Sequence, residues 1–129
     1  MKVDPHIHLW NLETGRYPWL QAPGKTFMGD YKALAKTHEV REFLEDADGI
    51  EVLKVVHVEA AHDPANPLAE THWLQILADT PGNSGMPQGI VAYADLSAHD
   101  VGDLLAAHAK NPNVRGIRQI LNVHPGPAL

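Results

Sequence analysis

Four short apolar runs alternate along the chain with polar stretches that have the period of a helix. The runs are Val3 to Trp10, Glu51 to Ala60, Gly89 to Leu96 and Val114 to Leu121. β-Branched residues are frequent in them, most clearly in EVLKVVHVEA, and each run has the length of a buried strand. Strands that alternate with helices are typical of βα units around a parallel sheet. The sequence therefore predicts an α/β fold with about four parallel strands.

Three segments between or after these runs have the apolar spacing of helices. In THEVREFLEDA the predicted N-cap is Thr37, and the spacing i, i+3, i+4, i+7 is held by Val40, Phe43, Leu44 and Ala47. In AETHWLQILAD one face is predicted to hold Trp73, Ile76 and Leu77. In SAHDVGDLLAAHAKN the predicted N-cap is Ser97, Asp100 lies in the first turn, and the apolar stripe is Val101, Leu104, Leu105 and His108.

The segment from residue 11 to residue 36 has Gly, Pro and aromatic residues but little periodicity, as in TGRYPWLQAPG. We interpret it as one long irregular loop after the first strand, and loops of that length are usually functional or disordered. The βα rhythm has no other long interruption and no internal repeat. Residues 1–129 are therefore predicted to form a single domain.

Composition narrows the classes of partner and cofactor. The 129 residues contain 10 Lys and Arg against 16 Asp and Glu, a net charge of −6, so a nucleic-acid backbone would be repelled. The absence of cysteine excludes disulfides, thiolate nucleophiles and Cys-type zinc sites, and any metal must be held by His, Asp or Glu. No secretory leader and no apolar run near the roughly 20 residues of a membrane span is evident. We expect a soluble, cytoplasmic protein.

The first strand carries the motif VDPHIHLW, in which two histidines lie one residue apart. Side chains alternate across a strand, so Asp4, His6 and His8 are expected on one face. The opposite, apolar face is predicted to hold Val3, Pro5, Ile7 and Leu9. Two imidazoles on one face can reach the same divalent ion at about 2.0–2.1 Å, and we predict that His6 and His8 are metal ligands. The alternative is that both are merely hydrogen-bonded.

Further candidates lie near the carboxyl ends of later strands, where ligands collect in parallel sheets. His57 and Glu59 end the second run, and the alternative roles are a hydrogen-bonded core histidine and a carboxylate that caps the following turn. Arg118 lies within the fourth run and requires an anionic partner or a substrate oxygen, and an internal salt bridge is the competing role. Tyr93 and Asp95 share a face of the third run, where Asp95 can equally serve the turn before Ser97.

The order and the residues of these motifs resemble those of a known family. DPHIHLW, YPWL, VVHVEA, ETHWLQ, GIVAYADL and VRGIRQIL follow one another as in the amino-terminal half of the amidohydrolase-2 family. These are metal-dependent hydrolases of TIM-barrel fold that include sugar lactonases and pyrone-dicarboxylate lactonase. The resemblance implies a partial barrel, metal ligands at His6 and His8, and site roles for His57, Glu59 and Arg118. A complete barrel usually needs about 250 residues, so this chain is expected to be an incomplete unit.

The resemblance also implies a reaction. We expect a lactone or related cyclic ester to be opened by water, with a divalent ion, zinc for preference, held by His6 and His8, while Arg118 and His57 orient the substrate. The general base is expected in the half of the barrel that has no counterpart here, and His124 does not replace it. One lactonase branch works without metal. The alternatives are a decarboxylase acting on a carboxylated cyclic substrate and a non-catalytic half-barrel module that associates with a second copy or with the missing half.

Overall fold

The computed structural model describes residues 2–22, 29–30 and 32–121. Within these residues the strands are β1 (Lys2–Ile7), β2 (Val52–Val58), β3 (Gly89–Tyr93) and β4 (Val114–Arg118). The helices are α1 (Pro18–Gln21), α2 (Val40–Asp46), α3 (Pro67–Asp79) and α4 (Val101–His108), with a short 3-10 turn, η1 (Lys32–Leu34). Strands β2, β3 and β4 lie within their predicted apolar runs, whereas β1 begins one residue before its run, at Lys2, and ends at Ile7. None of the described helices is long and apolar enough to cross a membrane.

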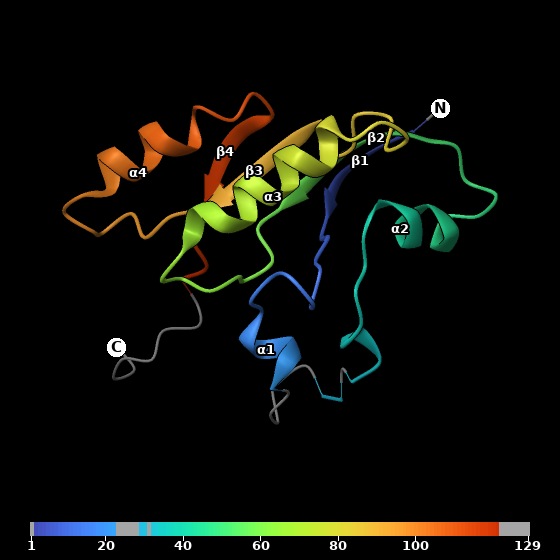
Figure 1. Ribbon diagram of the computed structural model, residues 1–129, viewed down its shortest axis with the longest axis horizontal. Coiled ribbons are helices and arrows are strands. Elements are labelled where there is room, and N and C mark those ends of the chain that lie inside the picture. The colour runs from blue at the N-terminus through green and yellow to red at the C-terminus, as the bar shows by residue number, and fades with distance from the viewer. Residues whose placement is uncertain (1, 23–28, 31, 122–129) are drawn as a thin grey trace.

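The strands form one parallel sheet in the order β1-β2-β3-β4, so every neighbour along the chain is also a neighbour in space. Figure 1 shows α3 lying across the sheet, with α2 on the side of β1 and α4 on the side of β4. Consecutive parallel strands joined by helices on one face are the pattern of a (β/α)8 barrel. The prediction of an α/β half barrel is confirmed.

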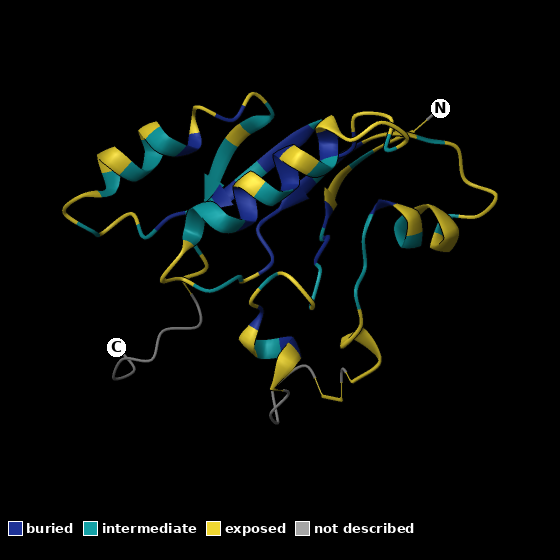
Figure 2. Cartoon of the chain, viewed as in Figure 1, coloured by how far each residue is buried: buried dark blue, intermediate teal, exposed yellow. Residues whose placement is uncertain are grey.

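The main core lies between the sheet and its helices, where the chain is most deeply buried (Figure 2). Its buried members come from the strands, from α2 and α3, and from the adjoining loops: Ile7, Leu9, Val40, Val55, Leu74, Met86, Ile90 and Ala92. Full burial of a side chain of this size contributes about 1.5–3 kcal/mol, so these contacts are the main force that holds α2 and α3 on the sheet. Val56 and Val91 alternate along their strands with the core residues Val55 and Ile90, so their side chains lie on the opposite face of the sheet.

Two predicted N-caps are wrong. Helix α2 begins at Val40, and its N-cap is Glu39, which forms a capping box with Glu42. The Thr37 hydroxyl instead accepts the backbone N–H of Leu12 at 3.2 Å. Helix α4 begins at Val101 after an Asp100 N-cap, while the predicted cap, Ser97, donates its hydroxyl to Asp95. In both places the hydroxyl had a tertiary or turn partner that the local pattern does not reveal.

The predicted face of α3 is confirmed in part, because Trp73 and Leu77 pack against the main core. Ile76 is 67% exposed, whereas the residues turned inward include the polar Thr71 and Gln75 beside Leu74. The Gln75 side-chain oxygen accepts the backbone N–H of Asn113 at 2.9 Å, just before β4. Buried polar groups are tolerated when they are hydrogen-bonded, which is why a hydrophobic pattern alone misplaced part of this face.

His108 ties α4 to the sheet, as its predicted place on the buried stripe requires. Its ring is 1% exposed, Nε2 donates to the Tyr93 carbonyl at 3.0 Å, and Nδ1 accepts the Thr71 hydroxyl at 3.0 Å. The Tyr93 carbonyl can only accept, so in the neutral ring the proton is on Nε2 and Nδ1 takes the Thr71 hydroxyl as its donor. Burial is the main cause that lowers the pKa of His108, and the bond to Tyr93 opposes it.

This arrangement predicts a stability that depends on pH. The unfolded chain binds a proton to His108 near the usual value of about 6.5, whereas the folded chain resists it, so stability falls as pH drops from about 6.5 toward the lowered folded pKa. We expect the free energy of unfolding in urea to decrease between pH ~7.5 and ~5.5, and to decrease less in His108→Gln. The surface variant His99→Gln, whose side chain is 98% exposed, should keep the full decrease, and an equal decrease in all three proteins would contradict this role.

The segment predicted as one long irregular loop, residues 11–36, contains α1 and η1 in its described part. Pro18 begins α1, where its missing N–H costs nothing. Trp10, Tyr17, Leu20 and Ala60 form a second buried cluster, and Trp19 Nε1 donates to the Ala60 carbonyl at 2.9 Å. Packing against the end of β2 therefore orders a stretch that has no apolar period. Residues 23–28 and 31 lie outside the described part.

Candidate functional site

His6 and His8 lie side by side at the carboxyl end of β1. Their ring centroids are 5.0 Å apart and the rings meet edge-on, at an interplanar angle of 77°. Two imidazoles on one tetrahedral zinc, each about 2.0–2.1 Å from the ion, have centroids about 5 Å apart. His6 is exposed and His8 is half-buried. The spacing of the pair is therefore that of two ligands to one ion.

The register of β1 against β2 shifts between Asp4 and Ile7, a β-bulge that includes His6. Asp4 is paired with Val55 and Ile7 with His57, so three steps along β1 match two steps along β2. Asp4 Oδ1 accepts the His6 N–H at 3.1 Å, and the simple alternation from Val3 to Leu9 is broken. The predicted apolar face is confirmed for Ile7 and Leu9, but Val3 is 58% exposed and Pro5 is also exposed.

The proton on His8 has a defined place. Nδ1 lies 2.8 Å from the Val58 carbonyl, which can only accept, so Nδ1 is the donor and the Nε2 lone pair remains. Burial is the main cause that lowers the pKa of His8, and His57, His6 and Arg118 act in the same direction against the bond to Val58. A neutral imidazole that donates its second N–H to a carbonyl is the usual form of a histidine metal ligand.

The described residues supply only part of a metal site. Among them no group of three or more His, Asp or Glu side chains could hold an ion. Zinc usually takes four ligands, three of them from protein in catalytic sites, so His6 and His8 fit as two of the set. His124 lies outside the described residues. The part of the chain that the structure describes thus fits half of a ligand shell.

His57 is near the pair but faces the helices. It is paired with Ile7, its ring centroid is 6.3 Å from that of His8, and it is fully buried. Its Nδ1 accepts the backbone N–H of Leu9 at 3.1 Å, while Nε2 has no hydrogen-bond partner among the described residues. The geometry matches a core histidine that is satisfied at one nitrogen. Its role in chemistry stays a prediction.

Glu59 and Arg118 are brought together. Arg118 Nε donates to Glu59 Oε1 at 2.7 Å, and Nη2 donates to the Glu59 backbone carbonyl at 2.7 Å. Glu59 is 1% exposed, and its Oε2 accepts the Ala61 N–H at 2.8 Å, whereas 31% of the Arg118 side chain is exposed. Both structural alternatives, the turn cap and the internal ion pair, are present. Contact of either residue with substrate stays a prediction.

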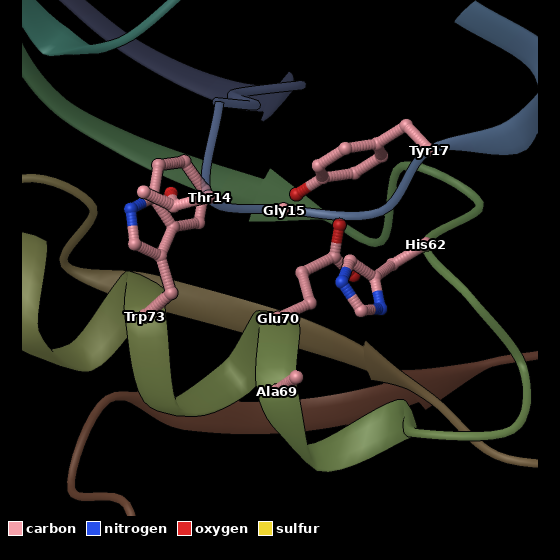
Figure 3. A pocket seen from close by; sticks show the side chains of 7 residues that line it. All are labelled: Thr14, Gly15, Tyr17, His62, Ala69, Glu70 and Trp73. Carbon is pink, nitrogen blue, oxygen red and sulfur yellow. The ribbon is translucent and has the colours of Figure 1, made fainter. Parts of the chain in front are cut away.

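A small pocket that the sequence analysis did not predict lies between the segment after β1 and the start of α3. A pocket of about 120 Å³ is lined there by Thr14, Gly15, Tyr17, His62, Ala69, Glu70 and Trp73. Figure 3 shows the Tyr17 hydroxyl and the Glu70 carboxylate pointing toward one another. Burial first, and Glu70 second, raise the pKa of Tyr17 far above its usual range. The available signal was that YPWL places Tyr17 and ETHWLQ places Glu70 close in sequence to large apolar residues.

Fold and site together define a class: a half barrel of βα units with a histidine pair at the carboxyl end of its first strand. The family model described as Amidohydrolase matches residues 3–129. The chain therefore belongs to the amidohydrolase family, and the prediction from the motif order is confirmed at this level.

A curated relative matches most of the chain. The chain is 50% identical over 123 residues to the uncharacterized protein y4mH of Sinorhizobium fredii (strain NBRC 101917 / NGR234). The match covers 95% of this chain and 40% of that protein, so the chain spans less than half the length of the relative. No solved structure matches the chain significantly.

Proposed function

We propose that this chain supplies the metal-binding half of a hydrolase that opens a lactone or related cyclic ester with water. The observation that carries the proposal is the His6–His8 pair, with the spacing of two ligands to one ion and with the His8 Nε2 lone pair left by the bond to Val58. Membership of the amidohydrolase family supports hydrolytic chemistry at the carboxyl ends of the strands, because active sites of the barrel fold lie there.

Each residue has a proposed part. His6 and His8 hold a divalent ion, preferably zinc, which when bound supplies Lewis-acid activation of the carbonyl and of water. Arg118 orients a substrate oxygen through Nη1, the guanidinium nitrogen without a hydrogen bond among the described residues, while Glu59 fixes Nε and Nη2. His57 holds the backbone after His8, because its Nδ1 accepts the Leu9 N–H. We assign the general base to a carboxylate outside the described βα units.

The test is ring opening by the purified chain mixed with a protein that supplies the remaining βα units of the barrel, because the general base is assigned outside the described units. We expect zinc-dependent proton release from a panel of sugar lactones and carboxylated cyclic esters, and its loss in His6→Ala/His8→Ala. His99→Ala is the matched control, since its side chain is 98% exposed beside Asp100. Carbon dioxide release without ring opening would favour a decarboxylase. A folded, zinc-binding chain inert toward every substrate would overturn hydrolysis by this chain and favour a non-catalytic half barrel.

A further inference from the structure

A line of buried polar groups leads from α3 to the backbone behind the histidine pair. Glu70, in the first turn of α3, is 4% exposed, and its Oε1 accepts the Ala60 N–H at 3.1 Å. The same Oε1 lies 3.6 Å from His57 Nε2. The other nitrogen of His57 accepts the N–H of Leu9, the residue that follows His8. Glu70, His57 and Leu9 therefore form one continuous chain of contacts.

The partners fix the tautomer of His57. Because Nδ1 accepts the Leu9 N–H, its lone pair is engaged and the proton of the neutral ring is on Nε2. That N–H is buried, and Oε1 of the Glu70 carboxylate lies 3.6 Å from Nε2. At 3.6 Å the contact is too long for a hydrogen bond, but attraction between an N–H dipole and a carboxylate is strong in a site without water.

We propose that Glu70 is a positioning residue for the His6–His8 pair, acting through the His57 ring on the Leu9 backbone. The carboxylate favours the Nε2–H tautomer, and only that tautomer offers Nδ1 to the Leu9 N–H. Without it the ring can turn over to the Nδ1–H form, which would place two hydrogens between His57 and Leu9. The end of β1 would then shift, and His8 with it. The proposal deepens the proposed function and rests on it where metal affinity is concerned.

Two variants of Glu70 separate positioning from packing. Glu70→Leu keeps the volume and removes the acceptor, so we expect the zinc affinity of the folded protein to fall about 10-fold or more, the size of effect that outer-shell partners have. Glu70→Gln keeps an oxygen that can accept from both Ala60 and His57, and should retain affinity within about 3-fold.

Gln75→Leu is the matched control. It lies on the same helix, is 8% exposed and accepts the backbone N–H of Asn113, far from the histidine pair. We expect it to lose stability without losing zinc affinity. A zinc affinity for Glu70→Leu equal to that of wild type or of Gln75→Leu would overturn the inference and leave the proposed function standing.

A second readout needs no metal. Imidazole ¹H–¹⁵N spectra of the metal-free full chain should show His57 as the Nε2–H tautomer in wild type and Glu70→Gln, and a different His57 pattern with shifted His8 signals in Glu70→Leu. If the wild type binds no zinc, the proposed function is overturned and these spectra alone decide the inference. Unchanged His57 and His8 signals in Glu70→Leu would then overturn it as well.

Discussion

Arg118→Ala is expected to lower the free energy of unfolding by about 3 kcal/mol, the low end of the cost of breaking a buried ion pair, because the guanidinium is partly exposed. The loss comes from Glu59, whose buried carboxylate would keep, in the part of the chain that the structure describes, the Ala61 N–H on Oε2 and lose its charged partner. The Glu59 backbone carbonyl would lose its bond to Nη2 at the same time. Unfolding in urea at neutral pH measures the effect.

Arg115→Ala provides the control on the same strand. Arg115 is exposed and its guanidinium bonds only the nearby carbonyls of Pro112 and Val114, so its removal should cost within about 0.5 kcal/mol. The double variant Glu59→Gln/Arg118→Met should recover part of the loss, because no charge is then left buried. An Arg118→Ala protein as stable as Arg115→Ala would show that the pair contributes nothing to the fold.

His6→Ala/His8→Ala is expected to reduce zinc affinity by about 100-fold or more, since loss of an outer-shell partner alone costs 10–100-fold. The variant removes both rings that lie 5.0 Å apart, and among the described residues it leaves the buried His57 as the imidazole in ring contact with that position. Competition against a chromophoric chelator, together with metal analysis of the protein peak from size-exclusion chromatography, measures the affinity and the oligomeric state together.

The matched control removes two histidines that face solvent. His72 lies on the exposed side of α3, and His99 is exposed before α4. His72→Ala/His99→Ala should keep wild-type zinc affinity and the same elution volume. Equal loss in the two double variants would mean that zinc binds to surface imidazoles in general, and the pair would have no special role.

The fold could be read from local patterns because each βα unit packs with its neighbour in sequence. The four apolar runs correspond to four strands that lie in the sheet in chain order. The alternation of strand and helix patterns in the sequence is enough to predict that order. The bulge in β1 could not be read in this way. It is defined by the pairing of Asp4 with Val55 and of Ile7 with His57, and Pro5 between them has no N–H to hold a regular ladder.

The candidate site likewise contains residues that local spacing predicts and residues that only the packing of distant segments brings together. His6 and His8 are neighbours in one strand, so their proximity follows from the spacing alone. Glu70 and Tyr17 come from segments far apart in the chain, and their meeting depends on how α3 and α1 dock. The fold also pairs Glu59 with Arg118, although each was predicted separately as a site residue.

The most direct measurement of the central claim is a long-range ¹H–¹⁵N spectrum of the histidine side chains during a zinc titration of the full chain. We expect metal-free His8 to show a protonated Nδ1 and an unprotonated Nε2. One equivalent of zinc should then move the Nε2 signal of His8 together with the ring signals of His6. The signals of His99 and His108 should stay in place. Zinc that leaves His6 and His8 unchanged, whether or not it binds elsewhere, would contradict the account.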